Sequence, residues 1–160
     1  MSRMKSKLIT AGVAASCAVG LIALKVAWAT PQQGVTTTIL TGGPMSLDEI
    51  DIHTDTDGHK VKLKTKGVSD VYVVRNVIVP GGDTGWHSHP GPSIISVISG
   101  TATAYEGDEP QGFVFSAGTA FVDSGDHRHI IRNEGTTNLE LIAFQILPEG
   151  ATRRIDEPAP

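Results

Sequence analysis

Cysteine is nearly absent from this sequence. Cys17 is the only one among 160 residues, and it lies in an N-terminal segment that we expect to be removed. The remaining chain can form neither a disulfide nor a thiolate nucleophile, even in an oxidising compartment. We therefore expect packing to stabilise the domain, with a bound metal as a further source of stability.

Positive charge is also scarce beyond the N-terminal segment. Residues 1–29 contain four basic side chains and no acidic one, so residues 30–160 carry 9 basic against 17 acidic side chains, a net charge of −8. An acidic domain repels phosphate backbones and anionic lipid heads. We expect no nucleic-acid partner and no direct binding to a membrane surface, which leaves a small-molecule ligand or substrate.

The first 29 residues resemble an export signal. Three basic residues precede an apolar run at residues 8–24, and the motif Ala-Trp-Ala at 27–29 has the small-x-small pattern of a cleavage site. We expect cleavage before Thr30 and a periplasmic or extracellular protein. Two alternatives remain. Residues 8–29 are nearly long enough to be an uncleaved membrane anchor, although Lys25 interrupts them, and Ala-Ala-Ser before Cys17 faintly resembles a lipidation site.

Long helical periodicity is missing as well. Ser46–Ile50 is the best short helix candidate, and elsewhere short apolar stretches alternate with Gly, Asp, Pro and Asn, which is typical of an all-β chain. We predict a linker at 30–35, one β-domain at 36–147 and a loose tail at 148–160. The predicted strands are Thr36–Leu40, Glu49–His53, Lys60–Thr65, Val71–Val79, Gly85–His89, Ile94–Tyr105, Gly112–Phe115, Ala120–Val122, His127–Asn133 and Leu139–Leu147.

Many short antiparallel strands favour a double-sheet jelly-roll barrel, because closure removes exposed edges. The polar stretch between His53 and His59 predicts a hairpin loop with exposed histidines.

A different pair, His87 and His89, is separated by one residue. On a strand such residues point to the same face, and neutral imidazole is the commonest metal ligand.

The residues around this pair resemble the first motif of the cupin superfamily. Gly81, His87, His89 and Gly100 match the motif spacing, whereas Ser93 stands where the family has a metal-binding glutamate. The chain thus resembles a small single-domain cupin of type 2, with a double-stranded β-helix fold. The resemblance also implies a dimer through an N-terminal strand, for which Thr36–Leu40 is the candidate.

A second cupin motif follows at the expected distance. Gly118, His129 and Asn133 hold the spacing, while the central Pro-x-Gly is displaced to Ser-Gly-Asp at 124–126. By this resemblance His87, His89 and His129 bind one divalent metal. Without the glutamate the metal's identity is open among Fe, Mn, Zn, Ni and Cu, because imidazole suits several of them.

Several neighbouring side chains have more than one reading. His127 is a further ligand, a proton-transfer group or a rim residue, depending on where its strand begins. Asp123 and Asp126 either orient a ligating imidazole or serve turn chemistry. Asn133 is expected to fix the turn that follows it. The remaining candidates are assigned to packing: Trp86 to the core or rim, and Tyr105 and Phe121 to the core, with the cavity wall as the alternative.

These residues leave the enzymatic status undecided and the catalytic residues unassigned. One hypothesis is a metal-dependent enzyme acting on a small molecule, dioxygenase-like or isomerase-like, in which the metal polarises substrate or activates O₂ or water. Another is a non-catalytic envelope protein that binds a small molecule or a metal, supported by the missing carboxylate. A third is a structural envelope protein with a vestigial site, since one fold hosts many functions.

Overall fold

Strands form the whole framework of the described chain. The computed structural model describes residues 29–160, so the predicted export signal lies outside the described residues except for Ala29. No helix in this part of the chain has the length and hydropathy that a membrane crossing requires. The strands are β1 (Gln33–Ile39), β2 (Met45–Leu47), β3 (Asp51–Thr56), β4 (His59–Lys64), β5 (Ser69–Asp83), β6 (His87–Ser88), β7 (Ser93–Ser99), β8 (Thr101–Glu106), β9 (Phe113–Ser116), β10 (Ala120–Asp123), β11 (His129–Arg132), β12 (Leu139–Pro148) and β13 (Ile155–Asp156).

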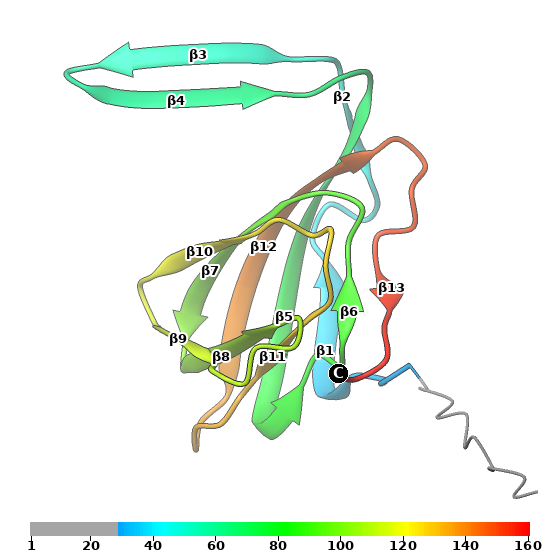
Figure 1. Ribbon diagram of the computed structural model, residues 1–160, viewed down its shortest axis with the longest axis vertical. Coiled ribbons are helices and arrows are strands. Elements are labelled where there is room, and N and C mark those ends of the chain that lie inside the picture. The colour runs from blue at the N-terminus through cyan, green and yellow to red at the C-terminus, as the bar shows by residue number, and fades with distance from the viewer. Residues whose placement is uncertain (1–28) are drawn as a thin grey trace, which may run out of the picture.

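One large antiparallel sheet bends into a nearly closed barrel (Figure 1). Its strand order is β10-β7-β12-β5-β11-β6-β13, with β1 and β2 on the long β5 strand and β8 joining β11 to β9. The longest pairing joins β12 to β5, from Pro148 opposite Ser69 to Leu139 opposite Ile78. The predicted all-β jelly-roll architecture is confirmed.

Alternation along β12 separates the inside of the barrel from the outside. Every second residue from Leu139 to Leu147 is buried, and the residues between them are exposed or half-buried. Successive strand side chains point to opposite faces, so this register turns one row inward. The inward row joins residues of β5, β7, β8 and β11 in one core, which comprises Val74, Ile78, Ile95, Val97, Ala102, Ala104, Ile131, Leu139, Leu141 and Ala143.

Two predicted elements differ from the structure. The strand expected over Ile94–Tyr105 is broken at Gly100, where φ is +77° and a Cβ atom would lie 2.7 Å from the Asn138 carbonyl oxygen. Glycine tolerates both conditions, so the chain turns there between β7 and β8. The short helix candidate at Ser46–Ile50 is wrong, because residues 45–47 pair with β5 as β2. An available strand edge outweighs a weak local helical preference.

Both ends of the β-domain are more ordered than the sequence suggests. β1 begins at Gln33, inside the predicted linker, and pairs with β5. The pairing of Thr36–Leu40 with a second copy stays a prediction. The tail is not a loose extension, because β13 pairs with β6 and the Glu157 amide donates to the Trp86 carbonyl at 2.9 Å. These hydrogen bonds use backbone groups, which tail composition does not reveal.

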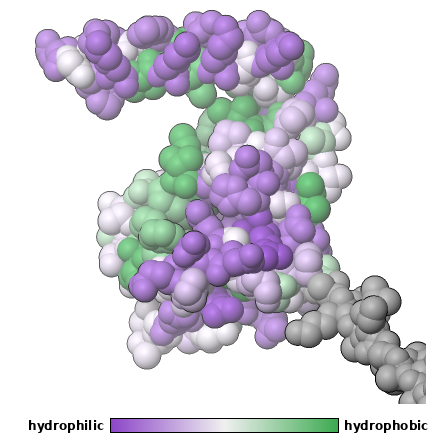
Figure 2. Space-filling view, viewed as in Figure 1, coloured by the Kyte–Doolittle hydropathy of each residue, from purple (hydrophilic) through white to green (hydrophobic). Residues whose placement is uncertain are grey.

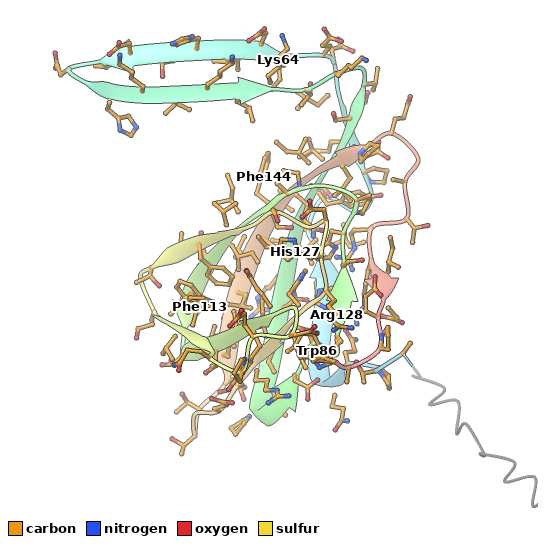
Figure 3. The ribbon with its side chains drawn as sticks, viewed as in Figure 1. Lys64, Trp86, Phe113, His127, Arg128 and Phe144 are labelled. Atoms are coloured by element: carbon orange, nitrogen blue, oxygen red, sulfur yellow. The ribbon has the colours of Figure 1, made fainter. Side chains whose placement is uncertain are left out.

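The β3–β4 hairpin projects away from the barrel (Figure 1). All its residues are exposed, including His53 and His59, as the sequence predicts. Figure 2 shows it as mostly polar, with apolar atoms along its lower side in that view. Lys64, labelled in Figure 3, pairs with Asp51 at 2.6 Å on this hairpin. The hairpin therefore lies apart from the barrel core.

We expect core truncation to cost far more stability than truncation on the hairpin. Leu141→Ala removes a side chain that is 1% exposed, and such changes cost about 2–5 kcal/mol. Leu63→Ala, on the hairpin at 38% exposure, is the matched control and should cost less than about 1 kcal/mol. Urea unfolding of both variants measures the difference. Equal losses would contradict the assignment of the core to the barrel.

Candidate metal centre

Three histidines from two distant segments of the chain meet inside the barrel. His87 lies in β6, His89 follows it by two residues, and His129 begins β11 directly opposite His87. All three side chains are buried, and one nitrogen of each lies within 4.8 Å of the corresponding nitrogens of the other two. Their ring centroids are 4.3–5.3 Å apart. The predicted trio thus forms a group that can hold a metal ion.

Backbone carbonyls determine which nitrogen of each ring faces the group. Nδ1 of His87 donates to the Gly85 carbonyl at 2.8 Å, Nδ1 of His89 to the Arg153 carbonyl at 2.6 Å, and Nδ1 of His129 to the His127 carbonyl at 3.2 Å. A carbonyl can only accept, so in each neutral ring the proton lies on Nδ1 and Nε2 keeps its lone pair. Such hydrogen bonds orient metal-binding histidines in many proteins.

Burial keeps these imidazoles uncharged. It lowers the pKa of His87 to about 2 and that of His89 to about 4, and it lowers the pKa of His129. Repulsion from a positive charge on His129 would lower the pKa of His87 and of His89 further. Neutral imidazole is the form that binds metals, so near pH 7 no proton has to leave before the three lone pairs can bind an ion.

Asp123 lies beside the histidine group. Its side chain is 4% exposed, and burial raises the pKa of the carboxyl group. Oδ1 accepts a hydrogen bond from the Gly125 amide at 2.9 Å, which is the predicted turn chemistry. Oδ2 lies 3.2 Å from Nε2 of His129 and has no hydrogen-bond partner in the described chain. The alternative reading, that Asp123 accepts the second N–H of an imidazole, does not apply because the His127 carbonyl takes that hydrogen.

The neighbouring pair Asp126 and His127 lies at the surface. His127 is about half exposed, with Nδ1 2.7 Å from Asp126 and Nε2 3.8 Å from Glu106. Of the three readings of His127, the rim position fits the structure, and the additional-ligand reading does not. The physical reason is that β11 begins only at His129, so strand alternation does not extend back to residue 127.

Ser93 and Gln145 form a polar pair beside the histidines that sequence reasoning recognised only in part. Ser93 is 1% exposed and Gln145 is 2% exposed. The Gln145 amide donates to Ser93 Oγ at 3.0 Å, and its nitrogen lies 3.5 Å from Nε2 of His89. Gln145 was not predicted. Its signal in the sequence is a polar residue at an inward position of the otherwise apolar β12 row.

The histidines open onto a cavity of about 40 Å³. Its wall includes Gln145 and, from the tail, Arg153 and Arg154. Arg153 donates to the Gln145 side-chain oxygen at 3.2 Å. Sequence reasoning missed both arginines, because the tail carries no strand pattern strong enough to place it over the barrel. The cavity is large enough for only a few water-sized groups.

The other predicted residues serve structure rather than the cavity. Phe121 stacks on Phe115 with ring centroids 4.2 Å apart, and Tyr105 hydrogen-bonds Glu134 at 2.9 Å. Trp86 is buried near the rim, close to Arg128 in Figure 3. The Asn133 side chain accepts from the Gly135 amide at 3.1 Å and so holds the following turn, as predicted.

The donor set fits a divalent metal ion. Three preoriented neutral imidazoles satisfy the usual requirement of a catalytic site, which has three protein ligands and keeps further positions for water or substrate. Beside them lies a buried carboxylate oxygen that no residue in 29–160 hydrogen-bonds. The choice among Fe, Mn, Zn, Ni and Cu is not decided by three imidazoles alone.

Comparisons with known proteins agree with the fold. Residues 74–145 match the family model described as a cupin domain. The polyketide cyclase RemF from Streptomyces resistomycificus superposes with a TM-score of 0.55 at 12% identity, covering 84% of this chain and 82% of that one.

Two further structures are similar at lower scores. A protein with a double-stranded β-helix domain from Klebsiella pneumoniae has 22% identity, coverage of 69% of this chain and 85% of that one, and a TM-score of 0.48. A cupin superfamily protein from Desulfitobacterium hafniense has 11% identity, coverage of 71% and 77%, and a TM-score of 0.48. A search of curated proteins found no match to this chain. Residues 74–145 of this chain are therefore a cupin domain.

Proposed function

We propose that this protein is a metal-dependent enzyme that acts on a small anionic molecule, with His87, His89 and His129 as the metal ligands. The observation that carries the proposal is the convergence of three uncharged, preoriented Nε2 atoms at the wall of one cavity. A purely structural site would be expected to have four protein ligands. Dioxygenase-like and isomerase-like reactions both suit this arrangement.

Arg154 supports an anionic substrate. Arg154 lines the cavity, and its Nη2 is buried without a hydrogen-bond partner in the described chain, while its Nε pairs with Asp156 at 2.7 Å. The charge of Arg154 also contributes to lowering the pKa of His87 and of His129, so it acts on the same space as the metal ligands. A small carboxylate would give this buried guanidinium the acceptor it lacks.

The groups around the substrate would have different roles. A bound divalent metal supplies Lewis-acid polarisation of an oxygen, or activation of water or O₂. Arg154 would hold a carboxylate group, and Arg153 keeps the Gln145 amide oriented. The apolar part of the wall, which includes Ile95 and Leu141, limits access of water and so strengthens these electrostatic contacts.

A non-catalytic binding protein of the cell envelope is the second candidate. The observation in its favour is Ser93, which leaves the family's glutamate position without a carboxylate. In that case the same cavity would retain a small molecule or a metal without turning it over. Recovery of a tightly held ligand from native protein, with no product formed in the presence of metal, is the result that would favour this candidate.

The metal site is tested first by elemental analysis of residues 30–160 purified without chelator or affinity-tag metal. We expect about one equivalent of metal in the wild type and almost none in His87→Ala/His89→Ala, because two of three ligands are lost. His53→Ala, which removes an exposed histidine of the hairpin, is the control and should keep the metal. Wild-type protein without metal after incubation with Fe²⁺, Mn²⁺ and Zn²⁺ would contradict the proposal.

Substrate class is tested with the metal-loaded protein and a panel of small carboxylates and matched neutral analogues. We expect turnover of a carboxylate only. Arg154→Gln should raise its KM roughly tenfold or more, since a hydrogen bond to a charged group is worth about 1.5–3 kcal/mol. Arg128→Gln, at the rim beside Asp108, is the control. Equal activity on neutral analogues, or an unchanged KM in Arg154→Gln, would rule out the anionic substrate class.

Export is the third part of the proposal. When the full chain is expressed in a bacterial host, we expect the protein outside the cytoplasm with Thr30 as its first residue. Ala27→Asp should block cleavage, because the site requires a small residue there. Intact mass measurement distinguishes the outcomes. A full-length protein in the membrane fraction would indicate an anchor, and a full-length protein in the cytoplasm would contradict export.

A further inference from the structure

We propose that Asp123 is a fourth metal ligand, which supplies from strand β10 the carboxylate that Ser93 lacks on strand β7. The inference rests on the proposed metal binding and deepens it. It adds a carboxylate to the three imidazoles, and a six-coordinate Mn²⁺ or Fe²⁺ ion would still have positions open for water or substrate. The argument depends on the register of three strands, the surroundings of the carboxylate and its contact with His129.

The strand register places Asp123 at the same level as Ser93. β10 pairs with β7 so that Asp123 lies directly opposite Ser93, and β12 pairs with the other edge of β7 so that Gln145 lies opposite the same residue. Directly opposed side chains share a face and have Cβ atoms about 4.5–5.5 Å apart. The three buried polar residues therefore form one row across three strands, and the carboxylate at 123 lies on the same face of the sheet as the side chain at 93.

The two oxygens of Asp123 have different surroundings. Oδ1 is held by the Gly125 amide, and φ at Gly125 is +90°, in a turn where a Cβ atom would collide with the Gly91 carbonyl. Oδ2 is buried and receives no hydrogen bond from any described residue. Burying a carboxylate oxygen is costly unless a donor or a cation compensates it. One oxygen is thus anchored, and the other lacks its compensating partner.

The contact with His129 indicates what that partner is. Oδ2 of Asp123 lies 3.2 Å from Nε2 of His129. Because Nδ1 carries the ring proton, donated to the His127 carbonyl, Nε2 and Oδ2 face each other as two lone-pair atoms. While Asp123 is ionised, these two atoms can share a cation but cannot hydrogen-bond each other. Two ligand atoms about 2.1 Å from one ion and about 100° apart lie about 3.2 Å from each other.

Two other roles for Asp123 fit less well. A carboxylate that only orients a histidine accepts from the ring nitrogen remote from the metal, whereas Asp123 faces the nitrogen on the metal side. A salt bridge to a protonated His129 would also satisfy Oδ2. That salt bridge would place a second proton on Nε2 of His129, the ring nitrogen that no backbone carbonyl accepts from and that faces the carboxylate at 3.2 Å. The metal-ligand role leaves no atom of this contact uncompensated.

A carboxylate ligand changes which metals the site prefers. Carboxylate suits Mn²⁺, whereas an all-imidazole set suits Zn²⁺, Cu²⁺ and Ni²⁺. Two imidazoles with one carboxylate and open positions bind Fe²⁺ in oxygenases. Asp123 should therefore matter most for Mn²⁺ and Fe²⁺ and less for Zn²⁺.

The test compares metal affinity in metal-free wild type, Asp123→Asn and Asp126→Asn. Asp126 is exposed on the same loop and contacts Ser124 and His127, so its variant is the matched control. We expect Asp123→Asn to weaken Mn²⁺ binding at least 100-fold and Zn²⁺ binding about tenfold, as measured by competition with a chelator. The control should change neither by more than about twofold. Loss of a residue that only orients metal ligands typically weakens metal binding about 10–100-fold, so a larger loss of Mn²⁺ affinity indicates direct ligation.

A spectroscopic readout separates direct ligation from damage to the fold. At saturating Co²⁺, Asp123→Asn should alter the visible absorption bands, because a ligand of the ion has changed, while Asp126→Asn should match the wild type. If wild type binds no divalent metal, the proposed function and this inference both fail. If wild type binds metal and Asp123→Asn has the same affinities and the same Co²⁺ spectrum, only this inference is overturned.

Discussion

The pairing of β12 with β5 on one edge and β7 on the other is the constraint on which the rest of the structure depends. It sets the register of the sheet's centre, and a slip of one residue would exchange every inward and outward side chain. The register that buries Leu139 and Leu141 also turns Gln145 inward, opposite Ser93. Core packing and the polar lining of the cavity therefore follow from the same hydrogen-bond ladder.

The centre depends equally on backbone groups that no side-chain motif specifies. Carbonyls of Gly85, His127 and Arg153 hold the three imidazoles, and the last comes from a residue 64 positions away in sequence from His89. The tail reaches that position because β13 pairs with β6. The tail thus helps to orient His89 and also brings Arg154 to the cavity wall. Its short pairing with β6 has a role in the site beyond its small contribution to the sheet.

If Asp123 binds the metal as proposed, the departure from the family motif is a relocation of charge and not its loss. At Ser93 the chain has a small hydroxyl residue that accepts from Gln145, and across the adjoining strand Asp123 is a buried carboxylate beside His129. A motif compares positions along one segment, so it does not detect a carboxylate that a neighbouring segment provides. Register between strands determines which side chains share a face, and it is a property of the folded sheet.

The sequence alone sufficed to predict the fold class, most strands and the grouping of the three histidines. These features depend on local alternation, turn residues and spacing within short segments. Alternation at His87 and His89 sufficed to put both rings on one face. Only the tertiary structure decided that His127 lies at the rim, that residues 45–47 form a strand, and that Gln145, Asp123 and Arg154 surround the histidines. The reason is physical: each of these outcomes depends on where strand β11 begins or on pairing between distant segments, and local sequence patterns do not record such pairing.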